Sequence, residues 1–485
     1  MSSIAPPLRH LPATTVADVL ERIAARIGAR YVVPPGAEAA PYLVETRGLF
    51  QGEAPAVLRP GTAEEVAFCV AQCAEAGLPL VAQGGNTGVV GGQTPFGEML
   101  ISLNRLDRIR DIDPTDLTAT VEAGCTLHAV QEAARAADCL FPLSIASEGT
   151  CRIGGNLATN AGGVAVLRYG NMRELTLGLE VVLPDGRLWN GLSRLRKDNT
   201  GYDLRDLFIG SEGTLGIITA ATLRLFPPPR QRSTAFIGLP SVEAALALFR
   251  RMRAVAGDSL TGFELLSDYC IETVLKHIPG TVRPLGERHA YYVLAELTST
   301  RLVDDLAALA EGVLEQAMEA GEIADAVIAA SETQATALWK LRETLPEAQK
   351  FEGGSIKHDV SVPVSRVPEF YTEASRLCEA HMPGVRVCGF GHMGDGNIHF
   401  NLSQPVGMDK AEFIAEWEAF NRLVHDLVAA LGGSISAEHG IGLLKREELR
   451  LYKDPVALEM MVAVKRAIDP AGLLNPGKVL MPGAS

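Results

Sequence analysis

Three glycine-rich segments between Gly84 and Ile217 constrain the fold of this 485-residue chain more than any other feature. They cover residues 84–92, 147–163 and 210–217, and the first follows a short apolar run that is predicted to be a strand. Glycine-rich segments expose backbone N–H groups, which can bind phosphate oxygens without a cationic side chain. One such segment is more often a turn than a cofactor cradle. Three in succession favour a cofactor-binding region built from backbone.

The segments do not match the common nucleotide-binding motifs. The chain has no Gly-x-x-x-x-Gly-Lys-Ser/Thr sequence, and residues 84–92 do not give a Gly-x-Gly-x-x-Gly motif that opens a helix. A phosphate-binding role must therefore rest on the three segments together.

Composition narrows the class of protein. The net charge is −14 and no run of basic residues occurs, which argues against nucleic-acid binding. Residues 1–7 lack the charged-then-apolar pattern of a signal peptide, and no stretch reaches the ~18 apolar residues of a membrane span. The eight cysteines include no Cys-x-x-Cys pair and are expected to be buried, reduced thiols. We therefore expect a soluble, cytoplasmic protein.

The sequence pattern changes at Pro227–Pro229, which is the best candidate for a linker. Short strands and helices surround the glycine-rich segments before it. Long Ala/Leu/Glu-rich helices alternate with strand-like runs after it, which indicates an α+β domain. The predicted helices cover 61–77, 126–138, 243–255, 301–320 and 331–351, and the predicted strands cover 78–82, 99–103, 118–123, 176–183, 216–225 and 291–297.

A histidine pair marks the most informative stretch, residues 389–401. Asp395-Gly396 predicts a two-residue hairpin turn, which would place His392 directly opposite His399. Asn401 would point to the same face, because side chains alternate along a strand. Two neutral imidazoles at this spacing suit a divalent metal.

A third metal ligand would have to come from another part of the chain. The candidate segment is 434–442, where Glu438 and His439 stand side by side among small residues. Two histidines and one carboxylate match a catalytic zinc site with an open coordination position.

The glycine-rich segments also resemble a known family. Residues 79–88, 149–163 and 210–217 look like the loops of the FAD domain of the vanillyl-alcohol-oxidase / p-cresol-methylhydroxylase type, in order and spacing, over roughly residues 35–226. The resemblance implies FAD, with its pyrophosphate on the first loop and its isoalloxazine against the other two. The first loop has no His or Cys and the second offers only Cys151, so a non-covalent flavin is expected.

The resemblance assigns cofactor contacts to all three loops and to the C-terminal segment. The implied FAD-binding residues are Gln83, Gly84, Gly85, Asn86, Thr87, Gly88, Gly91, Gly92, Pro142, Gly149, Thr150, Gly154, Gly155, Asn156, Ala158, Asn160, Ala161, Gly163, Glu212, Gly213, Gly216, Ile217 and Asn475.

Residues 389–401 and 434–442 resemble the C-terminal domain of FAD-linked D-2-hydroxy-acid dehydrogenases, the D-2-hydroxyglutarate and D-lactate enzymes and their bacterial relatives. The resemblance extends over nearly the whole chain, including 472–478. It implies that His392, His399 and Glu438 bind the metal and that His439 is the catalytic base. Zinc suits this ligand set, and manganese or cobalt could also serve.

The same resemblance places substrate contacts at Arg342, Lys357 and Asn401. Arg342 would bind a carboxylate through two nitrogens and Lys357 would add a point charge. Pro346 departs from the pattern, because the hydroxyglutarate enzymes tend to carry Ser or Thr there. Without that hydroxyl, hydroxyglutarate and other D-2-hydroxy acids both remain open as substrates.

These observations predict an α+β protein with two main parts. The first is a two-subdomain FAD-binding domain of the vanillyl-alcohol-oxidase type at 1–226, divided into about 35–105 and 106–226. The second is an α+β substrate (cap) domain at 230–455, with an antiparallel sheet flanked by helices. Residues 456–485 would return to the FAD domain.

The expected activity is oxidation of a D-2-hydroxy acid to the 2-oxo acid, by hydride transfer to flavin N5 with metal assistance. D-2-hydroxyglutarate or a related acid is favoured, and D-lactate is an alternative. Electrons would pass to an electron-transfer flavoprotein or a quinone, and the chain could form a homodimer. An oxygen-using oxidase of the same fold and, from another class, a zinc hydrolase are the rival functions.

Overall fold

The chain folds into two compact units in a computed structural model that describes residues 13–481. Within the described residues, the first unit comprises 13–162, 170–228 and 438–481, and the second comprises 163–169 and 229–437. The crossing between residues 228 and 229 coincides with the expected linker at Pro227–Pro229. The last crossing lies between residues 437 and 438, so residues 438–455, which were expected in the cap domain, belong to the first unit. Across residues 13–481, no helix combines the length and apolarity needed to cross a bilayer.

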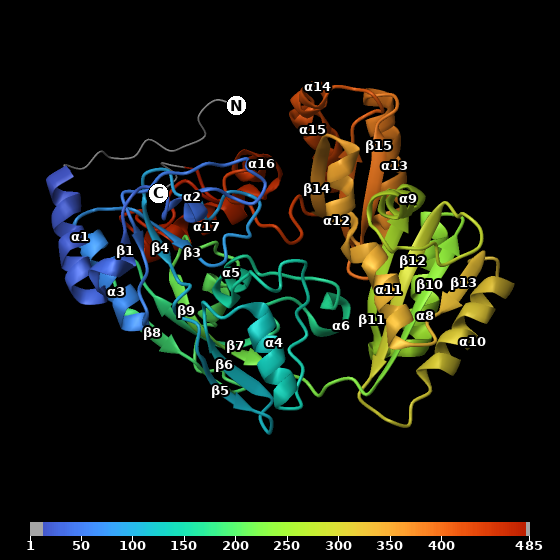
Figure 1. The fold of residues 1–485 in the computed structure, drawn as a ribbon, viewed down its shortest axis with the longest axis horizontal. Coiled ribbons are helices and arrows are strands. Elements are labelled where there is room, and N and C mark those ends of the chain that lie inside the picture. The colour runs from blue at the N-terminus through green and yellow to red at the C-terminus, as the bar shows by residue number, and fades with distance from the viewer. Residues whose placement is uncertain (1–12, 482–485) are drawn as a thin grey trace. The chain divides into compact units, whose positions relative to one another are not determined.

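Two sheets build the first unit (Figure 1). In the four-stranded sheet, β2 and β3 both run parallel to β4, whereas β1 is antiparallel to β2. The five-stranded sheet is antiparallel throughout. The spatial order of the four-stranded sheet is β1 (Val32–Val33), β2 (Val57–Leu58), β4 (Met99–Ser102), β3 (Leu80–Gln83). That of the five-stranded sheet is β5 (Ile109–Asp113), β6 (Thr118–Glu122), β9 (Ile217–Arg224), β7 (Thr176–Val182), β8 (Leu188–Gly191).

A side-chain cap fixes the start of α3, as its sequence predicts. Thr62 caps α3 by accepting a hydrogen bond from the Glu65 N–H at 3.2 Å. Cys69 and Cys73 lie on the buried face of α3, and all eight cysteines of the chain are buried and unpaired. The helices are α1 (Ala13–Ile27), α2 (Ala40–Leu43), α3 (Ala63–Glu75), α4 (Leu127–Ala136), α5 (Ile153–Ala158), α7 (Arg205–Phe208), α16 (Arg446–Tyr452) and α17 (Pro455–Ile468), with the 3-10 turn η1 (Ala29–Tyr31).

A seven-stranded antiparallel sheet forms the second unit, as expected for the cap domain. Its spatial order is β13 (Asp325–Ile328), β10 (Gln231–Leu239), β12 (Tyr291–Ser299), β11 (Leu260–Ser267), β15 (Arg386–His392), β16 (Asn397–Ser403), β14 (Ser355–Ser361). This unit also includes α6 (Val166–Tyr169), which contacts β11 although it lies between segments of the first unit in the sequence.

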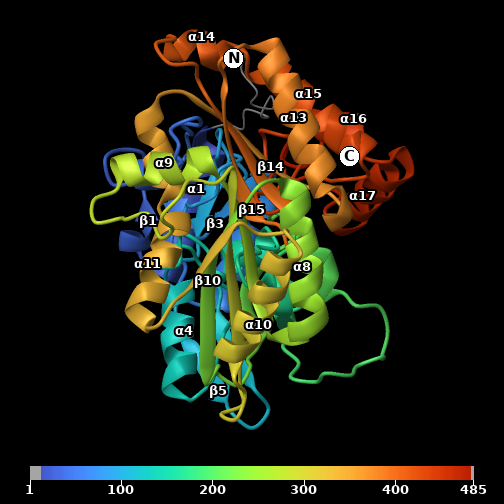
Figure 2. The same cartoon turned by 90° about the vertical axis from the view of Figure 1, so that its right-hand side faces the viewer.

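Helices cover both faces of this sheet (Figure 2). One face packs against α8 (Val242–Ala256), α10 (Leu306–Glu319), α13 (Val367–His381) and α15 (Trp417–Ala430), with α14 (Lys410–Ala415) beside them. The other packs against α9 (Asp268–His277), α11 (Glu332–Glu343) and α12 (Leu345–Ala348). Three 3-10 turns complete the unit: η2 (Gly257–Ser259), η3 (Gln349–Glu352) and η4 (Val364–Arg366).

The helix predicted over 331–351 is divided into α11, α12 and η3. Pro346 stands in the first turn of α12, just after the break at Thr344. Proline lacks an N–H and clashes with the preceding turn, so it begins a helix more readily than it continues one. This break gives α11 its C-terminal end one residue after Arg342.

Candidate active site

The three glycine-rich loops converge in the first unit. A Cβ added to Gly85 would lie 2.2 Å from the Thr150 carbonyl oxygen, so the first and second loops touch through bare backbone. The Glu212 N–H donates to the Ala158 carbonyl at 2.8 Å, which joins the second loop to the third. Asn475 connects the first and third loops, because its Nδ2 donates to the carbonyls of Gly92 and Glu212.

This loop cluster fits a phosphate-bearing cofactor. A cavity of about 350 Å³ lies beside the first loop and is lined by Tyr42 and residues 83–86, among others. The backbone N–H groups of Gly85, Asn86 and Thr87 donate to no protein acceptor within residues 13–481. Buried or half-buried N–H groups need a partner, and phosphate oxygens are a suitable one. Asn86 itself is held in a left-handed conformation, with its side chain donating to the Pro41 and Val44 carbonyls.

The hairpin that carries the two histidines differs from the prediction. β15 ends at His392 and β16 begins at Asn397, so the turn contains four residues and not the two predicted at Asp395-Gly396. His399 is therefore paired with Phe390, and the direct opposition of His392 and His399 is wrong. The segment after β14 holds this turn, because the Val362 N–H donates to the Gly396 carbonyl at 3.1 Å.

The two histidines nevertheless meet on one face of the sheet. His392 and His399 are diagonal neighbours across β15 and β16, and their ring centroids lie 5.6 Å apart. Diagonal neighbours are within reach of each other when both side chains are aromatic. Asn401 points to this face as predicted, paired with Lys357 on β14.

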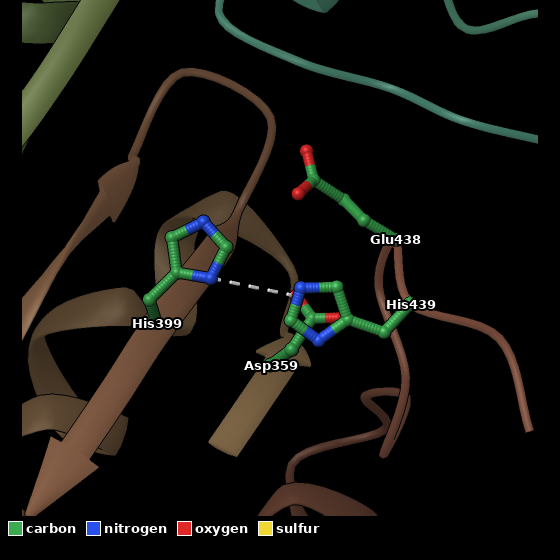
Figure 3. Close-up of side chains that lie close together, drawn as sticks. All are labelled: Asp359, His399, Glu438 and His439. Atoms are coloured by element: carbon green, nitrogen blue, oxygen red, sulfur yellow. Dashed lines mark ion pairs between the residues drawn. The ribbon is translucent and has the colours of Figure 1, made fainter. Parts of the chain in front are cut away.

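Four side chains form a cluster with the donor set of a metal site: Asp359, His399, Glu438 and His439 (Figure 3). One donor atom from each lies within 4.8 Å of the others. His399 and Glu438 were predicted as ligands and His439 as the base, whereas the sequence argument missed Asp359. His392, the remaining predicted ligand, is outside this set.

The positions of Glu438 and His439 follow from the chain immediately before them. Ser361 and Ser434 exchange two backbone hydrogen bonds, and the Ala437 N–H donates to the Asp359 carbonyl at 3.3 Å. Residues 434–437 therefore lie along the edge of β14 and are hydrogen-bonded to it. Glu438 and His439 are the next two residues.

Asp359 is buried and oriented within the sheet. It is paired with His399, whose Nδ1 lies 3.7 Å from the carboxylate, and it accepts a hydrogen bond from Asn397 Nδ2 at 3.0 Å. The alternation of β14 could have revealed it, since Lys357 and Asp359 are two residues apart and must share a face.

A second missed residue, Glu264, connects two of the predicted positions. Its carboxylate lies 2.6 Å from His392 Nδ1 and accepts a hydrogen bond from Arg342 Nε at 2.6 Å. Burial alone would raise the pKa of Glu264, but the charges and hydrogen bonds of His392 and Arg342 outweigh it and bring that pKa to about 2. A lone acid in the otherwise apolar strand 260–267 was the available sequence signal.

The structure also shows what surrounds two predicted substrate contacts, Arg342 and Asn401. Arg342 is buried at the end of α11, with its guanidinium 4.7 Å from the centre of the Phe390 ring. Asn401 Nδ2 donates to Gln349 Oε1 at 3.0 Å, so the turn η3 beyond Pro346 is tied to this face of the sheet.

Glu212 joins the third glycine-rich loop to the backbone that follows His439. Its two carboxylate oxygens accept hydrogen bonds from the N–H groups of Ile441 and Gly442, at 2.7 and 2.8 Å. Burial raises the pKa of Glu212 to about 7, although these two bonds act in the opposite direction.

Comparison with known proteins agrees with this geometry. Residues 228–479 match the model of the FAD-linked oxidases, C-terminal domain, and residues 54–191 match that of the FAD binding domain. The chain belongs to the FAD-linked oxidase family. It is a flavoprotein and an FAD-dependent oxidoreductase, as the glycine-rich loops predicted.

Curated relatives are similar to this chain over most of its length. A D-2-hydroxyglutarate dehydrogenase from Xanthomonas citri pv. viticola is 41% identical, covering 87% of this chain and 89% of the relative. A mitochondrial D-2-hydroxyglutarate dehydrogenase from Bos taurus is 38% identical, covering 98% and 86%. A D-2-hydroxyglutarate–pyruvate transhydrogenase from Saccharomyces cerevisiae is 33% identical, covering 89% and 87%.

Solved structures confirm the predicted fold class. p-Cresol methylhydroxylase with bound substrate aligns with a TM-score of 0.77 at 17% identity, covering 97% of this chain and 98% of that one. A 4-ethylphenol oxidase from Gulosibacter chungangensis aligns with a TM-score of 0.74 at 19% identity, covering 98% of each. At these identities the similarity shows the vanillyl-alcohol-oxidase type of fold alone.

Proposed function

We propose that this flavoprotein oxidises D-2-hydroxyglutarate, or a closely related D-2-hydroxy acid, to the 2-oxo acid. The observation that supports this most directly is a group of polar side chains on the sheet face that α9, α11 and α12 cover. Two cationic side chains, Arg342 and Lys357, share this face with the cluster of His399, Glu438 and His439. An anionic 2-hydroxy acid needs cations for its carboxylates and a base beside its hydroxyl.

The curated relatives favour hydroxyglutarate over other acids. Enzymes named D-2-hydroxyglutarate dehydrogenase share 38% and 41% identity with this chain over most of its length. Pro346 remains a departure from the pattern. The nearby Thr344 hydroxyl does not replace the missing group, because it donates to the Lys340 carbonyl at 2.7 Å.

In the proposed reaction, Arg342 and Lys357 bind and orient the substrate carboxylates, and Asn401 fixes the position of the substrate between them. His439 accepts the proton of the C2 hydroxyl, for which an imidazole is suited near neutral pH. FAD, when bound, would supply the two-electron acceptor for the hydride that leaves C2. The buried surroundings of Glu264 and Arg342 exclude water from this end of the site.

A divalent metal would be held by His399 and Glu438, with His392 as the third ligand implied by the family resemblance. It would polarise the C2 hydroxyl and so lower the energy of proton removal. Asp359, which faces His399, would orient that ring in the way that carboxylates commonly orient metal-bound histidines. Zinc is the proposed ion, with manganese or cobalt as substitutes.

The test is a panel of D- and L-2-hydroxy acids with an artificial electron acceptor, with and without a chelator. Selective oxidation of D-2-hydroxyglutarate, lost on chelation and restored by Zn²⁺, is the expected result. Preference for D-lactate would instead assign the chain to a short-acid enzyme. Failure to oxidise any 2-hydroxy acid while FAD is bound would refute the proposal, and chelator-insensitive turnover would refute the metal.

The electron acceptor and cellular setting are also proposals. We propose a cytoplasmic dehydrogenase that passes electrons to an electron-transfer flavoprotein or a quinone and that can form a homodimer. Oxygen consumption with substrate alone would instead identify an oxidase.

A further inference from the structure

Glu264 occupies an unusual place for a carboxylate. It lies in the middle of β11, fully buried, with Leu294 beside it on β12 and His392 beside it on β15. A buried carboxylate costs several kcal/mol unless charged or hydrogen-bonding groups compensate it. The chain provides two such groups, and they come from segments far apart in the sequence: His392 and Arg342.

Each contact uses one particular atom of the partner side chain. The Glu264 carboxylate binds His392 through Nδ1, so a metal would have to be bound by the other ring nitrogen, Nε2. It binds Arg342 through Nε, so the terminal guanidinium nitrogens are the ones that would meet a substrate carboxylate. A single side chain thus fixes the ring of one group and the guanidinium plane of the other.

We propose that Glu264 is a positioning residue that couples the metal site to the carboxylate-binding site through His392 and Arg342. This inference rests on the function proposed above. The carboxylate fixes the imidazole orientation for the metal, as carboxylates do for many metal-bound histidines. It also neutralises one buried guanidinium charge and stops that side chain from rotating away from the substrate.

A merely structural ion pair would predict something different. Loss of such a pair lowers stability, but it leaves the metal affinity and the Michaelis constant of the folded protein unchanged. A coupling role predicts that one substitution at Glu264 weakens both. By contrast, His392→Ala should mainly lower metal affinity, and Arg342→Lys should mainly raise the Michaelis constant.

Glu264→Gln is the main test, because it keeps the shape and removes the charge. In the FAD-bound protein, we expect the affinity for Zn²⁺ alone, measured by equilibrium dialysis with elemental analysis, to fall about 10- to 100-fold. The Michaelis constant for D-2-hydroxyglutarate should rise by at least about tenfold, from the lost alignment of Arg342. Flavin content should stay at the wild-type level.

Glu296→Gln is the matched control. Glu296 lies on the neighbouring strand β12, opposite Gly262 on β11, and accepts a hydrogen bond from Trp339 Nε1 at 2.8 Å. The control removes a carboxylate from the same face without touching His392 or Arg342. Zinc affinity and the Michaelis constant should both remain at their wild-type values.

Glu264→Asp covers the case in which Glu264→Gln does not fold. It keeps the charge but is one methylene shorter, so it cannot reach both His392 and Arg342 at their present distances. Zinc affinity and substrate affinity should both fall, and a folded Glu264→Asp protein that keeps both at wild-type values would overturn the coupling role.

The outcomes separate this inference from the function on which it rests. If the wild-type protein binds zinc and oxidises a D-2-hydroxy acid, but a folded Glu264 variant does both equally well, the coupling role is wrong and the proposed function stands. If the wild-type protein binds no zinc and oxidises no 2-hydroxy acid, the function itself is wrong and the coupling role is overturned with it.

Discussion

Glu212 offers the sharpest test of the electrostatics of the flavin-binding unit. Its pKa is raised from 4.5 to about 7 by burial, while its carboxylate accepts hydrogen bonds from Ile441 and Gly442. In the unfolded chain the group ionises near 4.5, so between these two values the folded protein binds more protons than the unfolded one. Stability contributed by this group is therefore fully present below pH 4.5 and is lost as the pH rises to about 7.

The size of the effect follows from the pKa difference. Each unit corresponds to about 1.4 kcal/mol, so the difference between 4.5 and about 7 amounts to at most about 3 kcal/mol. The Glu212 residue is half-buried by accessible surface, so water that reaches its carboxylate would reduce this value. Glu212→Gln cannot ionise and resembles the protonated acid, so it should lose this pH dependence.

The assay is denaturant unfolding of the wild type and Glu212→Gln at several pH values between 4.5 and 8, with saturating FAD. The stability of the variant relative to the wild type should rise with pH by up to about 3 kcal/mol. Glu45→Gln is a useful comparison, because Glu45 also accepts two backbone N–H groups, from Arg47 and Leu49. Parallel stability curves for the wild type and Glu212→Gln would refute the reasoning.

Three further substitutions test separate features. His399→Ala should reduce turnover at least about 100-fold and lower bound metal while the flavin absorbance remains, because the Lewis-acid contribution of a metal is worth several kcal/mol. Gly85→Ala should weaken flavin binding roughly 10- to 100-fold in a fluorescence titration, because its Cβ would collide with the Thr150 carbonyl. Lys478→Met should lower the free energy of unfolding by about 3–5 kcal/mol, because it leaves the fully buried Glu98 without its cation.

These three predictions have clear contrary outcomes and one shared control. Gly312→Ala introduces a Cβ into helix α10 with nothing within 4 Å, so it should keep its flavin and gain slightly in stability. Normal flavin affinity in Gly85→Ala would mean that the first two loops can separate at no cost. Unchanged metal content in His399→Ala would remove His399 from the ligand set, and unchanged unfolding of Lys478→Met would mean that water reaches Glu98.

Local sequence determined much of the flavin-binding part. Three glycine-rich segments in order predicted the cofactor loops, since a loop that lacks side chains exposes its own N–H groups. Thr62 predicted the start of α3 because its side chain satisfies an N–H of the first turn. Alternation along β16 placed His399 and Asn401 on one face without knowledge of their neighbours.

Only the tertiary structure decided the hairpin register and the contacts of the site. Asp395-Gly396 favours a two-residue turn by itself, but the hydrogen bond from Val362 holds the Gly396 carbonyl and a four-residue turn results. Asp359 meets Glu438 because the edge of β14 binds the chain as it returns 73 residues later, as the Ser361–Ser434 bridge shows. Pairing between distant strands depends on the packing of the whole sheet, which no local pattern encodes.

The same holds for Glu264. Its strand was predictable as apolar and buried, but the two groups that make a charge tolerable there, Arg342 and His392, lie 78 and 128 residues away in the sequence. The sequence by itself determined which chemical groups this protein contains and which loops can bind a flavin. The fold decided which of those groups touch, because desolvation makes a buried charge depend on partners that only the tertiary structure brings to it.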